Sequence, residues 1–313
     1  MKAFEFQKER NFDNIIEASF ALLRKHFLPM LKIFWKYNAV LIVVFIASNF
    51  FVNFLFIKKF ANYEKIIIRN LQFGLYDAQT IIVFILFTLV SFVFYLRFYA
   101  TVMGYIRVYK ENDGIVSSEK VKKYISTKFW SLFLLSFIVF ILYIIVVVIL
   151  AFFVGSVRGA QFIFFIVWLL GIIYYAVIIT ISYPVLFFDD ISVFSAFRHA
   201  QAYVKSRWWF SFFVLFVMLL ILWVLGLVVQ SPLYIYDYIK DLLGYSNINL
   251  SMSNKTDIPY ALLSTLLVII DYILKTAFLF AVSLLFFSLK EYHTQEGILS
   301  KIDQIGQKKE DEK

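Results

Sequence analysis

Long apolar stretches separated by short charged segments dominate the hydropathy pattern of this 313-residue chain. Four of these stretches contain no Asp, Glu, Lys or Arg: residues 37–57, 129–157, 159–188 and 208–236. Two further stretches are apolar apart from isolated charges, Arg97 within residues 78–106 and Asp271 and Lys275 within residues 258–289. About 20 apolar residues are enough to cross the hydrocarbon core of a bilayer. The pattern therefore predicts an all-α, polytopic membrane protein with six transmembrane helices.

A basic and aromatic segment precedes the first, third and fifth of these spans. The three segments are Arg24-Lys25-His26-Phe27, Ser126-Thr127-Lys128-Phe129-Trp130 and Lys205-Ser206-Arg207-Trp208-Trp209. Helices of this composition lie at the membrane surface, with their apolar side in the acyl boundary and their cations at the phosphates. We therefore expect an amphipathic interfacial helix before each of these spans. The expected lipid or partner contacts are Arg24, Lys25, Lys128, Trp130, Arg198, Lys205, Arg207, Trp208 and Trp209.

The first of these interfacial helices has a clear periodic signal. Residues 1–10 are polar, and we expect them to be loose. Asn14 and Glu17 then have the spacing of a capping box at a helix start. The apolar positions that follow recur on one helical face: Ile16, Phe20, Leu23 and Phe27. Pro29 is predicted to bend the chain into the first span.

The segment between the fourth and fifth spans follows the same logic. Either the pair Asp189-Asp190 or Ser192 is able to cap a short helix there. In that helix Val193, Phe197 and Val204 share one side, and the opposite side is polar. Its polar residues are Arg198, Gln201 and Lys205.

The distribution of basic residues predicts the orientation of the spans. The composition is 62% hydrophobic and only 16% charged, whereas soluble domains are near one quarter charged. With the N-terminus assigned to the cytoplasm, 21 Lys and Arg fall in cytoplasmic segments and 7 in outer segments. This positive-inside asymmetry predicts three helical hairpins with both termini in the cytoplasm. The net charge of +9 is then explained by topology and by attraction to anionic lipid headgroups, and not by nucleic acid.

The same pattern divides the chain into three parts. Residues 1–36 form a cytoplasmic N-terminus with an interfacial helix, residues 37–289 form the six-helix transmembrane domain, and residues 290–313 form a cytoplasmic tail. The chain contains no cysteine, which excludes disulfides and thiolate chemistry.

Three charged residues inside the predicted spans are the first candidates for chemistry. Asp271 and Lys275 lie four residues apart on the sixth span, so they share a face and are close enough to pair. Arg97 lies on the second span, at a depth that differs from that of Asp271 by roughly 9 Å. Charges within a membrane are a functional hypothesis by default. The favoured interpretation is nevertheless a neutralised cluster that fixes helix pairing, and the alternative is a relay or a binding site for an anionic group.

The acidic pair Asp189-Asp190 is the second candidate. Together with His199 it offers ligands for a metal or groups for acid–base work, but capping of the following helix is the favoured interpretation. The sequence contains no H-E-x-x-H, G-x-S-x-G, P-loop or G-x-G-x-x-G pattern. We therefore expect no catalytic residue, no metal and no cofactor.

A stretch of the second half resembles a known family. Its pattern consists of Tyr183-Pro184, Asp189-Asp190, Ser195-Ala196-Phe197-Arg198, Lys205-Ser206-Arg207-Trp208-Trp209 and Pro232. This pattern, with residues 12–34, is similar to six-span bacterial membrane proteins related to the membrane domain of glycerophosphoryl diester phosphodiesterases. The resemblance implies a bacterial inner membrane protein. It implies no hydrolase activity, because the catalytic barrel of those enzymes is absent from this sequence.

These observations favour a non-enzymatic integral membrane protein, either a scaffold or an accessory subunit of a membrane complex. Its expected partners are the lipid bilayer, anionic headgroups at the cytoplasmic face and other membrane proteins. The alternative is a transporter or lipid-handling protein that uses Arg97, Asp271 and Lys275.

Overall fold

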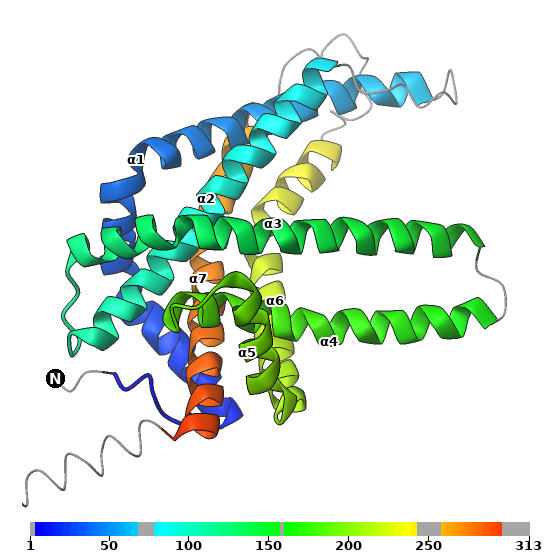
Figure 1. Ribbon diagram of the computed structural model, residues 1–313. Helices are drawn as coiled ribbons and strands as arrows, with labels where there is room; N and C mark the ends of the chain where they lie inside the picture. Colours follow the sequence, from blue (N-terminus) through cyan, green and yellow to red (C-terminus); the bar gives the residue numbers. More distant parts are fainter. Residues whose placement is uncertain (1–3, 68–77, 157–159, 243–257, 296–313) are drawn as a thin grey trace, which may run out of the picture. The chain divides into compact units, whose positions relative to one another are not determined.

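The computed structural model describes residues 4–67, 78–156, 160–242 and 258–295, and the regular structure within them is entirely helical. Figure 1 shows the helices α1 (Phe12–Ile67), α2 (Ala78–Glu111), α3 (Ser118–Ser156), α4 (Ala160–Phe188), α5 (Val193–Lys205), α6 (Trp208–Leu242) and α7 (Ile258–Thr294). Six of them, all except α5, are long and apolar enough to cross a membrane. The prediction of an all-helical, multi-pass membrane protein with six candidate spans is confirmed at this level.

The path of α1 differs from the prediction at two points. The helix begins at Phe12 and not at Asn14, and the backbone N–H of Ile15 donates to the carbonyl of Asn11 at 3.2 Å. The non-helical residue within α1 is Asn38, with φ −131° and ψ 18°, whereas Pro29 lies inside the helix. The Asn38 side-chain amide donates to the carbonyl of the residue four positions earlier, at 3.2 Å. A side chain that takes over a helical carbonyl in this way permits the break.

Two of the predicted interfacial helices are continuous with their spans. The helix α3 runs from the basic segment straight into the apolar stretch, and α1 does so with a kink at Asn38. The separate helix is α5, which ends at Lys205 with Ser206 as its C-cap, before α6 begins. Its N-cap is Ser192, whose hydroxyl accepts from the backbone N–H of Ser195 at 3.4 Å. Of the two predicted caps for this helix, Ser192 is thus the one used.

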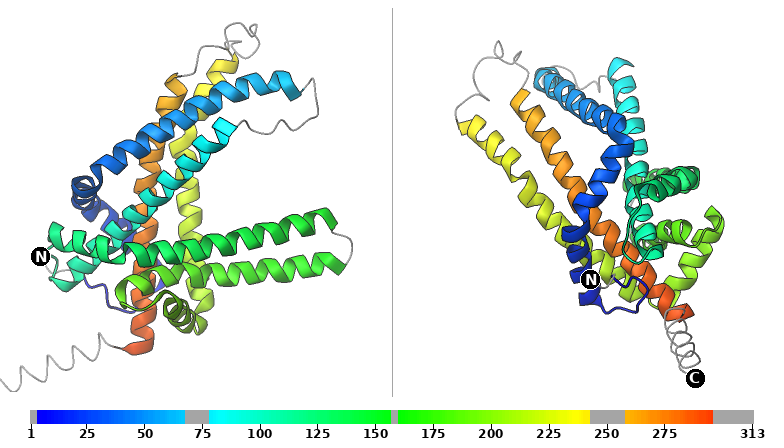
Figure 2. Two further views of the ribbon diagram at one scale, coloured as in Figure 1. Left: turned by 45° about the horizontal axis from the view of Figure 1, so that its top comes forward. Right: turned by 90° about the vertical axis from the view of Figure 1, so that its left-hand side faces the viewer.

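The chain divides into two compact units, each made of segments far apart in sequence. The first unit consists of described residues up to 30, from 99 to 219 and from 277 onward. The second unit consists of described residues from 31 to 98 and from 220 to 276. In the first unit α3 and α4 lie side by side, and α5 packs against α4 (Figure 2).

Aromatic packing joins helices within the first unit. Phe188 at the end of α4 stacks on Phe286 of α7, with ring centroids 5.6 Å apart and an interplanar angle of 11°. Phe188 also contacts Phe287 at 4.8 Å, and Tyr203 of α5 lies 6.2 Å from Phe286. These rings fix the end of α4 against α7, which positions the chain that follows α4.

The second unit has an aromatic core of its own. Phe45 of α1 stacks on Phe94 of α2 at 4.0 Å. The ring of Tyr272, on α7, stands edge-on to Phe45, Phe94 and Phe98 at 5.6, 4.9 and 5.2 Å. Phe34 contacts both Phe94 and Phe98 at 5.4 Å. The described part of this unit is therefore held together by ring contacts among α1, α2 and α7.

Candidate functional site

The connection between α4 and α5 positions two aspartates side by side. The last turn of α4 includes a bond from the backbone N–H of Asp189 to the carbonyl of Val185, at 3.0 Å. Asp190 follows with a φ of 54°, a left-handed conformation that Asp tolerates better than most residues. This residue ends the helical path and leads the chain to Ser192, the cap of α5. The two carboxylates therefore lie at the junction of two helices.

Arg107, near the end of α2, holds Asp190 with both ends of its guanidinium. Nη1 donates to Oδ1 at 2.9 Å and Nη2 to Oδ2 at 2.6 Å, a bidentate geometry. Nη1 also donates to the carbonyl of Phe187 at 2.9 Å, so the same side chain satisfies a carbonyl at the end of α4. Nε pairs with Glu111 at 2.9 Å, and the guanidinium lies 4.4 Å from the ring centroid of Tyr124 on α3. Arg107 thus joins α2, α3 and the α4–α5 connection.

Two lysines complete the pairing of the aspartates. Lys128 of α3 places Nζ 2.6 Å from Asp190 Oδ1 and 3.3 Å from the carbonyl of Leu186. Lys290 of α7 places Nζ 2.8 Å from Asp189 Oδ1. We call Asp189, Asp190, Arg107, Lys128 and Lys290 the aspartate network. It links α2, α3 and α7 to the junction of α4 and α5.

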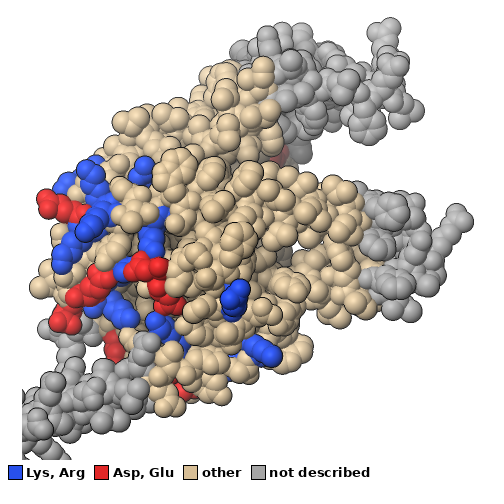
Figure 3. Space-filling model, in the orientation of Figure 1, with Lys and Arg blue, Asp and Glu red and all other residues tan. Residues whose placement is uncertain are grey.

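Burial and charge within the aspartate network are uneven. The side chains of Asp189 and Lys128 are 10% and 11% exposed, whereas that of Asp190 is 53% exposed. The hydrogen bonds from Arg107 lower the pKa of Asp190 to about 2, with a further contribution from Lys128. Solvent around a half-exposed carboxylate weakens these interactions. In Figure 3 charged side chains gather around the start of α3, while the surface over its farther part carries none in that view.

This geometry corrects the expectation for the acidic pair. The carboxylates of Asp189 and Asp190 bind cationic side chains, and the cap of α5 is supplied by Ser192. His199 is exposed on α5, with its ring against Tyr203 at 6.3 Å. Within the part of the chain that the structure describes, no group of three or more His, Cys, Asp or Glu residues is arranged to hold a metal ion.

The first described residues, 4–10, were expected to be loose, but they pack against two helices. The ring of Phe6 is buried between Tyr109 of α2 and Phe287 of α7, at centroid distances of 5.9 and 5.7 Å. The backbone N–H of Arg10 donates to the hydroxyl of Ser288 at 2.9 Å. We call residues 4–10 the N-terminal strap, because this segment fastens the end of α2 to the end of α7. Two apolar residues in a short polar sequence gave too weak a signal to predict this.

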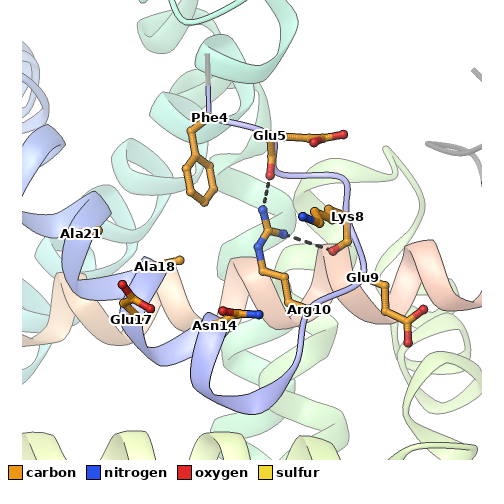
Figure 4. Close-up of a pocket in the computed structure, with 9 residues that line it drawn as sticks. All are labelled: Phe4, Glu5, Lys8, Glu9, Arg10, Asn14, Glu17, Ala18 and Ala21. Carbon is orange, nitrogen blue, oxygen red and sulfur yellow. Dashed lines mark hydrogen bonds between the residues drawn. The ribbon is translucent and has the colours of Figure 1, made fainter. Parts of the chain in front are cut away.

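The N-terminal strap is organised around the guanidinium of Arg10. That group donates to the carbonyls of Glu5 and Lys8 (Figure 4). It also donates to the carbonyl of Phe6, and it lies 5.1 Å from the ring centroid of Phe4. Burial lowers the pKa of Arg10, and nearby Glu5 opposes this effect. The strap borders an open hollow of about 430 Å³ on the first turns of α1. Its lining residues are Phe4, Glu5, Lys8, Glu9, Arg10, Asn14, Glu17, Ala18 and Ala21.

A further ion pair ties the strap to the start of α6. Glu9 Oε1 lies 2.6 Å from Arg207 Nη2. The guanidinium of Arg207 also stacks over the ring of Tyr292 on α7, 3.6 Å from its centroid. Arg207 is therefore engaged with two protein groups.

A buried histidine lies near the strap. His26 is 7% exposed, and its Nδ1 is 2.9 Å from the hydroxyl of Tyr105 on α2. Its ring stands edge-on to Tyr109 at 4.9 Å, and its Nε2 has no hydrogen-bond partner among the described atoms. His26 thus joins α1 to α2 inside the first unit, and its basic neighbours Arg24 and Lys25 are exposed.

The predicted intramembrane charges lie in the second unit. Lys275 Nζ is 2.7 Å from Asp271 Oδ2, and both side chains are 46% exposed. Arg97 is partly buried on α2. Tyr272, next to Asp271, packs on Phe98, next to Arg97, at 5.2 Å. The contact between the second and sixth spans that the predicted cluster requires is therefore present, and the cluster itself stays a prediction.

The predicted lipid contacts fall into two groups. The exposed group is Arg24, Lys25, Trp130, Arg198, Lys205 and Trp209. In contrast, Lys128 and Arg207 are bound to carboxylates, and Trp208 stacks on Tyr174 at 5.7 Å. Burial of Lys128 in the aspartate network argues against its expected role at the headgroups.

Sequence reasoning missed the partners of the acidic pair. Arg107 and Lys290 stand at the edges of predicted spans, where basic residues are explained by topology alone. The available signal was that each is the first charged residue after its apolar stretch. Asp189 is likewise the first charged residue after its stretch, so the sequence predicts a similar membrane depth for Arg107, Lys290 and Asp189. It does not indicate which of the helices are neighbours.

Comparison with protein-family models, with curated proteins and with solved structures finds no match to this chain. The resemblance to six-span bacterial membrane proteins therefore stays a prediction.

Proposed function

We propose that this protein is a non-enzymatic membrane scaffold or an accessory subunit of a membrane complex. Its six spans form three hairpins with both termini in the cytoplasm of a bacterium, and the protein resides in the inner membrane. The observation that carries this proposal is the aspartate network. Charged side chains are the groups that acid–base chemistry would use. In the aspartate network each of them is bound to an oppositely charged side chain from another part of the fold.

The apolar surface of the first unit supports the same function. Large apolar residues in the middle of α3 and α4 are more than half exposed: Phe140, Tyr143, Val148, Val167 and Leu170. A membrane protein exposes such side chains to lipid or to another membrane protein. A rigid polar end combined with a long apolar pair of helices suits a protein that holds partners in the bilayer.

Co-purification tests the scaffold directly. The full chain is isolated from its membrane in a mild detergent, and the bound proteins are identified and quantified against it. We expect at least one membrane protein in a fixed ratio to the chain, retained when the detergent is exchanged. A monomer that carries no stoichiometric partner in several mild detergents would contradict the proposal.

The topology has a separate test, because the chain contains no cysteine. Single substitutions Glu119→Cys and Asn249→Cys place one thiol in each of two segments, residues 107–128 and 237–257, that are predicted to lie on opposite sides of the membrane. A membrane-impermeant maleimide should label Asn249→Cys in intact cells, and Glu119→Cys only after the membrane is opened. The reverse labelling would contradict the predicted orientation.

A second candidate function, transport or lipid handling, is favoured by one observation. The Asp271–Lys275 pair lies well inside a candidate span and remains half exposed. Reconstituted vesicles with fluorescent phospholipid test it by measuring transfer between leaflets. Under this function the chain accelerates transfer, and Asp271→Asn abolishes the acceleration at equal protein content. No acceleration by the unmodified chain would remove this candidate.

A further inference from the structure

The helix α5 presents two different faces. Its buried residues are Val193, Ala196, Ala200 and Val204. The opposite face carries Phe194, Arg198, Gln201 and Lys205, which are exposed and follow the helical spacing i, i+4, i+7 and i+11. Phe194 is 72% exposed although it is a large apolar side chain. We call these four residues the outward face of α5.

The outward face carries positive charge that no acidic residue neutralises within the part of the chain that the structure describes. No Asp or Glu occurs in α5, and neither Arg198 nor Lys205 has an ion-pair partner among the described residues. The closest acidic residues in sequence, Asp189 and Asp190, are already neutralised within the aspartate network. An anionic partner therefore meets two free cations on this surface.

The neighbouring elements place this surface at the edge of a membrane. With 13 residues α5 is too short to span a bilayer, and it connects α4 to α6, which are both candidate spans. Trp209, in the first turn of α6, is 66% exposed. Exposed Trp beside Lys and Arg is typical of the headgroup level, where a ring sits at the acyl boundary and the cations reach the phosphates.

We propose that the outward face of α5, together with Trp209, binds the headgroups of anionic phospholipids. Arg198 and Lys205 contact the phosphates, and Phe194 enters the acyl boundary beside them. This inference rests on the proposal that the chain is an integral membrane protein, and it names a lipid partner for one of its surfaces. It also separates this basic segment from Lys128 and Arg207, whose charges are used inside the protein.

Native mass spectrometry of the full chain in a mild detergent tests the proposal. Phosphatidylglycerol or phosphatidylcholine is titrated in, and the affinity for each bound lipid is obtained. Each cation near an anionic surface contributes enough that the double variant R198Q/K205Q should bind phosphatidylglycerol roughly 10-fold to 30-fold more weakly. Its affinity for phosphatidylcholine should not change.

Two matched variants control this measurement. The double variant R198K/K205R keeps both charges and should retain the affinity for phosphatidylglycerol within about twofold. The double variant K308Q/K309Q removes the same net charge from the predicted tail and should leave the affinity unchanged. A drop in K308Q/K309Q equal to that in R198Q/K205Q would overturn the assignment to α5.

Three further outcomes would overturn the proposal. They are an unchanged affinity for phosphatidylglycerol in R198Q/K205Q, an equal loss for both lipids, and competition by free glycerol phosphate. Thermal unfolding of each variant verifies that Arg198 and Lys205 act on lipid and not on the fold. Because binding in detergent does not depend on orientation, the proposed topology can fail in the cysteine test while this inference holds, and the reverse.

Discussion

The two units of this protein place an acid beside a base in different ways. In the first unit Asp190 pairs with Arg107 of α2 and Lys128 of α3, two residues from other helices. In the second unit Asp271 pairs with Lys275, one turn along the same helix. The first arrangement ties separate elements together, whereas the second adds no connection between elements. Similar distances, 2.6 and 2.7 Å, therefore have different consequences for the fold.

The second unit obtains its connections from rings. Tyr272 contacts Phe45 of α1 and both Phe94 and Phe98 of α2. Aromatic pairs of this geometry add about 0.5–1.5 kcal/mol each beyond the area that they bury. The first unit thus adds ion pairs between helices to its ring contacts, whereas rings join helices of the second unit and its charged pair lies within one helix. The Asp271–Lys275 pair is therefore the one whose removal should disturb the fold least.

The largest effect is expected from the ring that joins three helices. Tyr272→Ala removes all three contacts and leaves a cavity, so it should lower the free energy of unfolding by about 3 kcal/mol. The matched control Tyr272→Phe keeps the ring and should stay within about 0.5 kcal/mol of the unmodified protein. Thermal or denaturant unfolding in detergent measures both. A small effect of Tyr272→Ala on the free energy of unfolding would contradict the claim that ring contacts hold the helices of the second unit together.

A somewhat smaller effect is expected from the centre of the aspartate network. Arg107→Gln removes the bidentate pair and the bond to the carbonyl of Phe187. Loss of one partner from a buried pair costs about 3–5 kcal/mol, and the half-exposed Asp190 reduces this to about 2 kcal/mol. Arg107→Lys keeps the charge without the fork, so it should recover only part of the loss. Full recovery by lysine would show that charge alone matters.

The stability contributed by Asp190 in the aspartate network should depend on pH. The pKa of Asp190 is lowered from 3.8 to about 2, so its pairing stabilises the folded state fully above about pH 4. That contribution disappears as the pH falls through about 2, because both folded and unfolded states then bind the proton. We expect the stability difference between the unmodified protein and Asp190→Asn to shrink between pH 4 and pH 2. A difference that stays constant over this range would contradict the pairing.

The sequence predicted the helices well because hydropathy depends on each residue and its near neighbours. The six stretches named from hydropathy all lie in α-helices where the structure describes them, and Ser192 caps α5 as one of two predicted options. Asp271 and Lys275 were predicted to meet because their spacing of four residues forces them onto one face. These successes share one property: the determining contacts are local in the chain.

Two of the three failures involve contacts between distant segments. Phe6 and Arg10 are buried by residues of α2 and α7, which no local pattern in the first ten residues indicates. The same is true of Lys128, whose exposed role was predicted from its basic neighbours and whose carboxylate lies on another helix. The break in α1 is different, because a polar side chain at Asn38 competes for a carbonyl where proline was expected to act. Predicting the burial of Phe6, Arg10 and Lys128 requires knowing which helices touch.

The smallest effect on stability is expected from the pair in the second unit. In the transport candidate the exposed side of this half-exposed pair faces water, where pairs within one helical turn contribute only about 0.3–0.5 kcal/mol. The variant Asp271→Asn should therefore unfold within about 0.5 kcal/mol of the unmodified protein, and its abundance in the membrane should be unchanged. Unfolding in detergent and quantitative immunoblotting of membranes measure the two quantities.

The outcome for Asp271→Asn decides what the pair is for, because it can be set against Arg107→Gln. If Asp271→Asn lowers abundance as much as Arg107→Gln, the pair holds helices together and the contrast between the units is wrong. If abundance is kept and Lys275→Gln behaves alike, the fold does not need the pair. Loss of partner retention or of lipid transfer in a variant that folds normally then assigns the function to this side of α7. The charged pair that contributes least to folding is for that reason the most informative one to remove.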